Sequence, residues 1–481
     1  MGFDVDYRRH MAPFSFYWHD YETFGVVPRR DRPAQFAGVR TDADLNEIDA
    51  PLTVYCKPAL DSLPNPEACL ITGITPQVCE ERGLSERVFA ESIEAQLAQP
   101  GTVGCGYNSL RFDDEVTRFL FWRTLIDPYA REWQNECGRW DLLDTVRCAW
   151  AMRPEGITWP TRDEGKPSFR LEHLTAANGI AHEAAHDAMS DVRATIALAR
   201  LVKQQQPKLW AHCLKLHKKQ AVIDEMGVGR PFAHLSGRYA VERGCMAVVW
   251  PLAPHPKFKN EVIVWDLAHD PSALFALNAE AVRERLFTAA DALPAGQTRL
   301  PIKTIHLNKS PIVIGNLKTL GTAASRWSID IDQALRHADI AARGANSMAG
   351  IWPEVYERAP STEAVDVDED LYGGFLDNED RRALQRLRQL PPERLAERRP
   401  AFNDARLDEL LLRFRARNHF DTLNAADRAV WRAHCRDAWH AAPAWFERIT
   451  QLETDADARG RDILAALRHW GAATQSALET R

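Results

Sequence analysis

Short apolar segments alternate with helical segments over residues 14–205, and this alternation constrains the fold of the 481-residue chain more than any other feature. Runs rich in aromatic and β-branched residues predict strands, and apolar residues at helical spacing predict helices. The predicted strands are residues 14–19, 35–40, 52–56 and 103–107, and the predicted helices are residues 86–98, 114–125 and 187–203. This order predicts an α/β domain, and the polar run from Gln204 to Pro207 marks its end.

The rest of the chain has a different texture and predicts two further domains. Four short predicted strands at 246–252, 262–267, 302–307 and 311–315, with a helix near 278–288, indicate a small β-rich domain. Residues 342–370 read as a linker, because prolines are followed by an acidic run that ends at Asp370. The Arg- and Leu-rich sequence beyond it predicts a helical bundle. We therefore expect domains at residues 13–206, 207–355 and 361–481.

Composition excludes several classes of protein. No apolar run approaches the ~20 residues of a membrane span, and the charged N-terminus does not resemble a secretory signal. Nine scattered cysteines without a Cys-x-x-Cys pair predict reduced thiols in a cytoplasmic protein and no structural zinc site. The formal net charge of −7 disfavours a nucleic-acid partner unless the basic residues gather on one face, with acidic runs such as the linker elsewhere.

The triplet Asp20-Tyr21-Glu22 is the strongest single candidate for chemistry. It follows the strand predicted for residues 14–19, where a polar turn is expected over residues 20–25. Residues two apart on a strand point the same way, so the carboxylates of Asp20 and Glu22 converge, and such oxygen ligands suit Mg²⁺ or Mn²⁺. The alternative is a solvent-exposed strand end with no function.

Two further clusters contain the remaining candidates. Asn108-x-x-x-Phe112-Asp113 follows a predicted strand and opens a helix, so that Asp113 is either a third carboxylate of the site or a residue that favours the helix N-terminus. His186 and Asp191 lie at the start of the Ala-rich helix. A histidine there suits a general base, whereas helix capping is the structural alternative.

Taken in order, these residues resemble the DEDDh branch of the DnaQ-like 3′→5′ exonuclease superfamily. The tyrosine branch would place Tyr four residues before the last Asp, and that position is Asp187. Longer runs resemble the bacterial exonuclease I family over nearly the whole chain. These runs include His19 to Gly25, Asp31 to Phe36, Leu70 to Pro76, Arg111 to Arg118, Asp127 to Ala130, Arg139 to Asp144, Pro167 to His173, Tyr372 to Phe375 and Arg415 to Asn418.

The resemblance implies a fold, an activity and a set of roles. The fold would be an RNase H-like DnaQ-type exonuclease domain with a mixed sheet, then an SH3-like β-rich domain and an all-α C-terminal domain. The activity would be removal of 5′-mononucleotides from the 3′ end of single-stranded DNA with two Mg²⁺ ions, for which Mn²⁺ is expected to substitute. Asp20, Glu22 and Asp191 would hold the metal, Asp113 would complete the shell, and His186 would take the proton of the attacking water.

The resemblance also implies the residues that contact DNA and the partners of the protein. Basic and aromatic residues interleave between residues 111 and 153, as a single-strand groove requires, although most of these aromatics are expected to be core. The expected contacts to DNA are Glu22, Arg118, Tyr129, Trp133 and Arg147, with Arg170 at the terminal nucleotide. A monomer, docking of the acidic C-terminal tail of single-strand-binding protein, and a role in repair and recombination are implied by the family alone.

Three competing interpretations stay open from the sequence. An oligoribonuclease of the same superfamily would keep the chemistry, but such enzymes often consist of little more than the nuclease domain. A polymerase proofreading subunit would not need the long C-terminal extension. A single-stranded DNA-binding scaffold with a decayed site would normally have lost at least one of the five catalytic-type residues.

Overall fold

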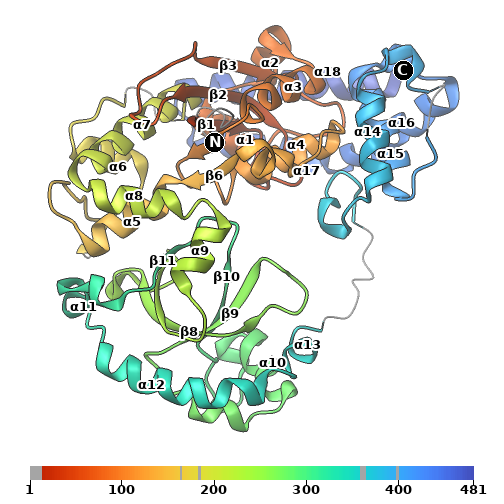
Figure 1. Cartoon of the computed structure of the whole chain (residues 1–481). Helices are drawn as coiled ribbons and strands as arrows, with labels where there is room; N and C mark the ends of the chain where they lie inside the picture. Colours follow the sequence, from red (N-terminus) through yellow and green to blue (C-terminus); the bar gives the residue numbers. More distant parts are fainter. Residues whose placement is uncertain (1–13, 163–164, 183–185, 358–364, 397–399, 481) are drawn as a thin grey trace, which may run out of the picture. The chain divides into compact units, whose positions relative to one another are not determined.

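The computed structural model describes residues 14–162, 165–182, 186–357, 365–396 and 400–480 (Figure 1). The chain forms two compact units, which are described one at a time. The first contains residues 1–138, 182–196 and 363–481, and the second contains residues 139–181 and 197–362. No helix among the described residues is long and apolar enough to cross a membrane.

A mixed six-stranded sheet, with strand order β4-β3-β2-β1-β5-β6, organises the first unit. Its strands are β1 (Ser15–Thr23), β2 (Pro33–Thr41), β3 (Leu52–Cys56), β4 (Gly83–Leu84), β5 (Thr102–Gly106) and β6 (Gly138–Asp141). The central strand β1 pairs antiparallel with β2 and parallel with β5, and every residue of β2 is buried. The α/β fold and mixed sheet expected from the sequence are confirmed.

The strand predicted for residues 14–19 continues as β1 to Thr23, so the turn expected at residues 20–25 was placed too early. Antiparallel pairing with β2 extends to Glu22↔Gln35, and main-chain hydrogen bonds therefore outweigh the polar character of Asp20 and Glu22. Both candidate carboxylates consequently lie on the central strand of the sheet, and not in a flexible turn.

Helices α3 (Glu86–Leu97) and α4 (Asp113–Arg123) form a core against one face of this sheet. Tyr17 and Tyr21 of β1 are buried in that core together with Phe89 and Leu120. Because side chains alternate along a strand, Asp20 and Glu22 point to the opposite face. Helix α7 (Ala188–Gln205) begins near this second face, since the Ala188 N–H donates to Gln35 Oε1 at 3.4 Å.

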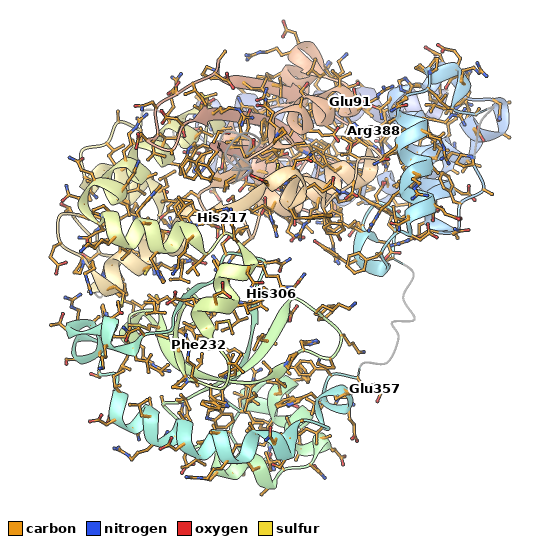
Figure 2. All side chains as sticks on the ribbon, viewed as in Figure 1. Glu91, His217, Phe232, His306, Glu357 and Arg388 are labelled. Atoms are coloured by element: carbon orange, nitrogen blue, oxygen red, sulfur yellow. The ribbon has the colours of Figure 1, made fainter. Side chains whose placement is uncertain are left out.

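The C-terminal helices belong to the same unit and pack against the α/β domain that contains the six-stranded sheet. They are α14 (Asn378–Arg388), α15 (Arg406–Asn418), α16 (Ala425–Ala438), α17 (Ala442–Asp455) and α18 (Ala458–Thr480). Phe119 and Trp122 of α4 share a core with Phe414 of α15, and α1 (Pro66–Thr72) and α2 (Pro76–Arg82) share another with α17 and α18. Arg388, labelled on α14 in Figure 2, donates to Glu94 of α3 at 3.0 Å.

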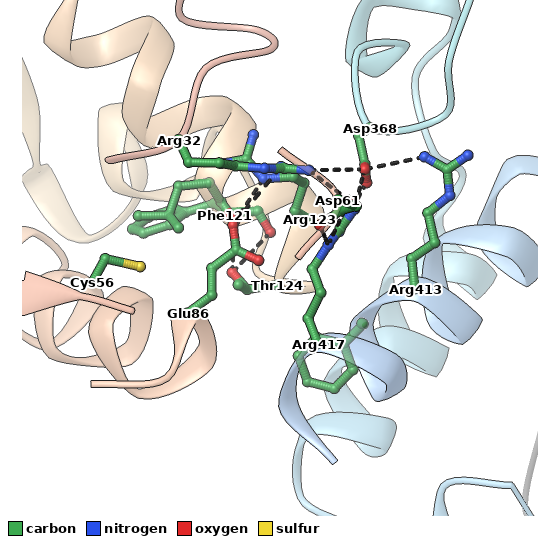
Figure 3. Close-up of polar contacts among 12 residues, drawn as sticks. Arg32, Cys56, Asp61, Glu86, Phe121, Arg123, Thr124, Asp368, Arg413 and Arg417 are labelled. Carbon is green, nitrogen blue, oxygen red and sulfur yellow. Dashed lines mark hydrogen bonds and ion pairs between the residues drawn. The ribbon is translucent and has the colours of Figure 1, made fainter. Parts of the chain in front are cut away.

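A buried ionic network adds to this apolar contact (Figure 3). Arg417 of α15 donates to both Asp61 and Asp368, and Arg32 lies 3.1 Å from Asp61 and 3.2 Å from Asp368. Arg413 also reaches Asp368, at 3.1 Å. Burial alone would raise the pKa of Asp61, but the guanidinium groups of Arg417 and Arg32 bring it well below its usual range. The network therefore holds charged groups in a buried position by pairing them.

This network changes the interpretation of the acidic run near residue 370. The sequence predicted a solvated linker there, but Asp368 is buried and bound to three arginines. The Trp122 indole N–H donates to the Val367 carbonyl at 2.8 Å, so the main chain is anchored as well. Residues 358–364 lie outside the described part of the chain. The segment from Asp366 onward is thus part of the packed unit.

The second unit is built on a five-stranded antiparallel half-barrel, with strand order β10-β9-β8-β7-β11, as expected for an SH3-like domain. The strands are β7 (Phe232–Leu235), β8 (Met246–Pro254), β9 (Glu261–Asp266), β10 (Ile302–His306) and β11 (Ile312–Ile314). Phe232, labelled in Figure 2, lies in its core. Strand β7 was not predicted, because four residues between polar segments give little periodicity. The unit's helices are α5 (Leu142–Met152), α6 (Leu171–Ala177), α8 (Pro207–Lys215), α9 (Lys219–Met226), α10 (Ala279–Phe287), α11 (Thr322–Arg326), α12 (Ile331–Gly344) and α13 (Trp352–Val355).

Candidate active site

Three carboxylates from two elements form the centre of the candidate site. Asp20 and Glu22 come from β1, and Asp191 comes from the first turn of α7. One oxygen from each of the three lies within 4.8 Å of the others. Glu22 is buried and Asp20 and Asp191 are half-buried, so the cluster is partly shielded from water. The predicted convergence of the first and third sequence clusters is therefore present in the fold.

Asp113 contacts the main chain of β1 beside this centre. Strand β5 pairs with β1 only as far as Trp18, which leaves later peptide groups on that edge open to side chains. The Tyr21 N–H donates to Asp113 Oδ1 at 3.1 Å, and Asp113 is buried. Asp113, at the start of α4, thus fixes the N–H group of Tyr21, the residue between Asp20 and Glu22. It lies outside the set of three carboxylates that could share one ion.

The loop before α7 places His186 beside Asp191. The His186 N–H donates to Asp191 Oδ2 at 3.2 Å, and the residue is exposed. Its φ of 67° lies in the left-handed region, which costs a non-glycine residue about 1–2 kcal/mol. Helix capping, the alternative role for His186, is performed by the next residue, because Asp187 Oδ1 accepts the Ser190 N–H at 3.0 Å.

Burial and mutual repulsion raise the pKa values of the carboxyl groups in the cluster. Burial raises the pKa of Asp20 well above its usual range, and Asp113, Glu22, Asp191 and Asp187 raise it further. Burial also raises the pKa of Glu22 to about 8, with Asp191 the next cause. Carboxylates this close remain ionised only when a cation neutralises them. A hard divalent cation with oxygen ligands fits this site.

A second group of residues has the spacing of metal ligands, but the pKa values of its carboxyl groups are lowered. Asp61, Asp368 and His434 also bring potential ligand atoms within 4.8 Å of one another. Here Arg417 and Arg32 already neutralise the carboxylates, as the lowered pKa values of Asp61 and Asp368 show despite burial. The charges of this group are therefore satisfied by arginine, so that of these two groups among the described residues the Asp20 cluster is the one that calls for a metal ion.

The aromatic residues predicted between residues 111 and 153 divide into core and surface. Buried residues are Phe119, Phe121, Trp122 and Trp140. Trp133 is 67% exposed, and Tyr129 is half-buried, with its ring 5.9 Å from that of Phe375. The expectation that most of these aromatics are core therefore holds. Phe375, itself 81% exposed, adds an accessible ring from the segment Tyr372 to Phe375, which resembles the family but was not predicted to contact DNA.

The predicted basic contacts differ in their surroundings. Arg118 is buried, donates to Glu132 at 2.7 Å and 2.9 Å and to Glu115 at 2.8 Å, and lies over the Tyr129 ring. Arg147 and Arg170 belong to the second unit. Arg147 pairs with Asp144 at 2.7 Å, whereas the side chain of Arg170 is exposed.

Two residues near the carboxylates were missed by the sequence analysis. Asp187 was noted only as a departure from the tyrosine branch, yet it contributes to the raised pKa values of Asp20 and Glu22. His182 lies 2.5 Å from Asp191 through its Nε2 atom. The available signal was a second histidine four residues before His186 in the same loop.

A mixed sheet that presents two carboxylates on its central strand, completed by aspartates at two helix starts, defines a metal-dependent exonuclease domain. Comparison with known families agrees, since "Exonuclease" matches residues 17–199, "Exonuclease I SH3-like domain" residues 217–358 and "Exonuclease I C-terminal domain" residues 365–474. The chain belongs to the exonuclease I family. Membership implies that divalent metal ions take part.

Similar proteins cover nearly the whole chain. Exodeoxyribonuclease I of Haemophilus influenzae is 43% identical over 462 residues, which are 94% of this chain and 97% of the relative. Escherichia coli exonuclease I in complex with a dA16 oligonucleotide is 41% identical with a TM-score of 0.91, covering 96% of this chain and 100% of that one. The zinc-bound form of the E. coli exonuclease I complex with single-stranded DNA has a TM-score of 0.89, with the same identity and coverage.

Proposed function

We propose that this hydrolase is a 3′→5′ exodeoxyribonuclease that removes 5′-mononucleotides from single-stranded DNA with two Mg²⁺ ions. The cluster of Asp20, Glu22 and Asp191, whose raised pKa values call for a cation, is the observation that supports this function best. The relatives named above are exodeoxyribonucleases, and the solved complexes contain single-stranded DNA. The domains in this proposal are residues 13–206, 207–355 and 361–481.

Three of the four carboxylates would bind metal, and the fourth would position the strand that carries two of them. Asp20, Glu22 and Asp191 would hold the ions, and Asp113 would keep the peptide of Tyr21, and with it both β1 carboxylates, in place. When bound, the two ions stabilise the negative charge on the attacking and leaving oxygens of an in-line displacement. Mn²⁺ is expected to substitute, because it accepts the same oxygen ligands.

His186 would act as the general base. Its exposed position in the loop, next to Asp191, leaves the imidazole accessible to a water molecule and to the end of a DNA strand. The base takes a proton from water, the water oxygen bonds to the terminal phosphorus, and the bond from phosphorus to the 3′ oxygen of the preceding nucleotide breaks. The leaving 3′ oxygen takes up a proton from solvent, so the products are a 5′-mononucleotide and a strand with a new 3′ hydroxyl.

Trp133 and Tyr129 are the proposed stacking residues for the single strand, because they are accessible where the neighbouring aromatics are buried. Arg170 is the proposed contact to the terminal nucleotide, and Glu22, Arg118 and Arg147 are further proposed contacts to DNA. The Arg118 guanidinium is bound by Glu132 and Glu115 and lies over the Tyr129 ring. Replacement of Arg118 is therefore expected to disturb Tyr129 as well as the contact to DNA.

Partners and cellular role follow from the family and stay predictions. Docking of the acidic tail of single-strand-binding protein, a monomeric state and a role in DNA repair belong to this part of the proposal. A cytoplasmic location agrees with the state of the cysteines, since all nine lie in the described residues, are buried and are not joined in disulfides there.

Digestion of end-labelled oligomers tests the function directly. Single-stranded DNA labelled at either end would be incubated with Mg²⁺ or excess chelator, beside duplex DNA and RNA of the same sequence. We expect immediate release of the 3′ label as a mononucleotide, abolished by chelator and by Asp191→Asn but not by the control Asp455→Asn, an exposed aspartate of α17. Preferential digestion of RNA would favour the oligoribonuclease, and DNA binding without digestion would favour the scaffold.

A further inference from the structure

A second histidine approaches the carboxylate cluster from the loop between α6 and α7. His182 Nε2 lies 2.5 Å from Asp191 Oδ1, and the His182 side chain is only 7% exposed. A contact this short and this shielded is a strong charge-assisted hydrogen bond when Asp191 is ionised. Because a metal-ligating carboxylate carries no proton, Nε2 must then carry the hydrogen and act as the donor.

The geometry separates His182 from the potential ligands. The three carboxylates offer oxygens within 4.8 Å of one another, and His182 is not a member of that set. It contacts Asp191 from outside the cluster. Nε2 is moreover engaged with Asp191 Oδ1, which makes His182 a poor candidate for a metal ligand through that atom.

Both oxygens of Asp191 are held by the same loop. Oδ1 faces His182 Nε2, and Oδ2 accepts the His186 N–H at 3.2 Å. A carboxylate in the first turn of a helix can otherwise rotate about its side-chain bonds, whereas two donors on its two oxygens define one orientation. The Asp191 carboxylate is thus oriented by two neighbours from one loop.

We propose that His182 is a positioning residue that holds the Asp191 carboxylate in the orientation that directs one oxygen toward Asp20 and Glu22, and thereby tightens the binding of the divalent ion. This inference rests on the proposed function, because it assigns metal binding to Asp191. Outer residues that hydrogen-bond to metal ligands commonly change metal affinity 10- to 100-fold when removed.

Metal binding without DNA tests this role. Isothermal titration with Mn²⁺ would compare the wild-type protein with His182→Ala and with His182→Gln, whose amide nitrogen can donate from nearly the position of Nε2. We expect roughly 10- to 100-fold weaker binding in the alanine variant and recovery of most of the affinity in the glutamine variant. His337→Ala is the control, since His337 is also half-buried and hydrogen-bonded, to the Leu267 carbonyl at 2.8 Å in the second unit.

Turnover at increasing Mn²⁺ provides a second measurement. If His182 positions a ligand, His182→Ala requires more Mn²⁺ for half-maximal turnover but approaches the wild-type maximum at saturation. Unchanged Mn²⁺ affinity in the alanine variant would overturn the proposal, and so would equal loss in both variants, which would indicate that the imidazole itself is required. If the wild-type protein neither bound Mn²⁺ nor digested DNA, the proposed function would fail instead.

Discussion

Replacing Asp20 by Asn should stabilise the metal-free protein while it abolishes activity, and the stabilisation should grow with pH. Asp20, Glu22 and Asp191 approach within 4.8 Å of one another, and their pKa values are raised. The folded protein therefore binds more protons than the unfolded chain between the ordinary carboxyl pKa and about pH 8, the value for Glu22. Stability from this cluster is present at low pH and is lost as pH rises through that window.

The size of the effect follows from the separation of the charges. Two unit charges 4.8 Å apart repel by about 3.5 kcal/mol at an effective dielectric constant of 20. At pH 6 protonation already relieves this repulsion, and asparagine, which is isosteric with the carboxylic acid, should change little. At pH 9 the Glu22 carboxyl is above its pKa of about 8 and ionises, and Asp20→Asn removes a neighbouring carboxyl group that can repel it. We expect a gain in free energy of unfolding of about 2–4 kcal/mol at pH 9.

Urea unfolding with excess chelator at pH 6 and pH 9 measures this difference. Asp455→Asn, which removes an exposed aspartate of α17, controls for the change in net charge. Saturating Mg²⁺ should restore stability to the wild-type protein much more than to the variant, because a ligand stabilises only the state that binds it. A variant that is less stable than wild type at pH 9, or equally affected at both pH values, would refute the account of a crowded, cation-requiring cluster.

Three further perturbations have defined outcomes. His186→Ala should lower turnover by about 10²–10⁴-fold while single-stranded DNA still binds, and near-normal single-turnover rates would disprove the base assignment. Trp133→Ala should weaken DNA binding by about 1–3 kcal/mol in fluorescence anisotropy, with binding of the wild type also weakening as salt rises; affinity insensitive to both would contradict the proposed groove. Arg417→Ala should cost about 3–5 kcal/mol of unfolding free energy, because Asp61 and Asp368 lose their shared partner, and a loss below 1 kcal/mol would show that Arg32 and Arg413 suffice.

The sequence predicted the parts of the fold that depend on local pattern. The strand at residues 52–56 and the helix near residues 86–98 were found because a β-branched and aromatic run and a helix-forming composition are local features of the sequence. Asp20, Glu22 and Asp191 were found because their order and spacing match a known template. The strand through Asp20 and Glu22 was ended too early, since two acidic residues argue locally against a central strand. A functional site is where such a local rule is expected to fail.

Contacts between distant residues could not be predicted in the same way. The acidic run near Asp368 has the composition of a solvated linker, and nothing local reveals that Arg32 and Arg417 neutralise it. The approach of His182 to Asp191 depends on a loop conformation that the nine-residue spacing does not determine. The burial of Trp122 depends on the C-terminal helices that share its core, whereas Trp133 lies between two short 3-10 turns and is exposed.

The ionic network has a consequence for the order in which the protein is made. Arg417 lies 356 residues after Asp61, its partner. At a synthesis rate of about 5–20 residues per second, the ribosome adds Arg417 roughly 20–70 s after Asp61. During that interval Arg32 and Asp61 lack the guanidinium that joins them to α15 in the finished chain. We therefore expect the nuclease unit to reach its final packing only after α15 has been synthesised, so that a nascent chain that ends before Arg417 does not yet hold the finished unit.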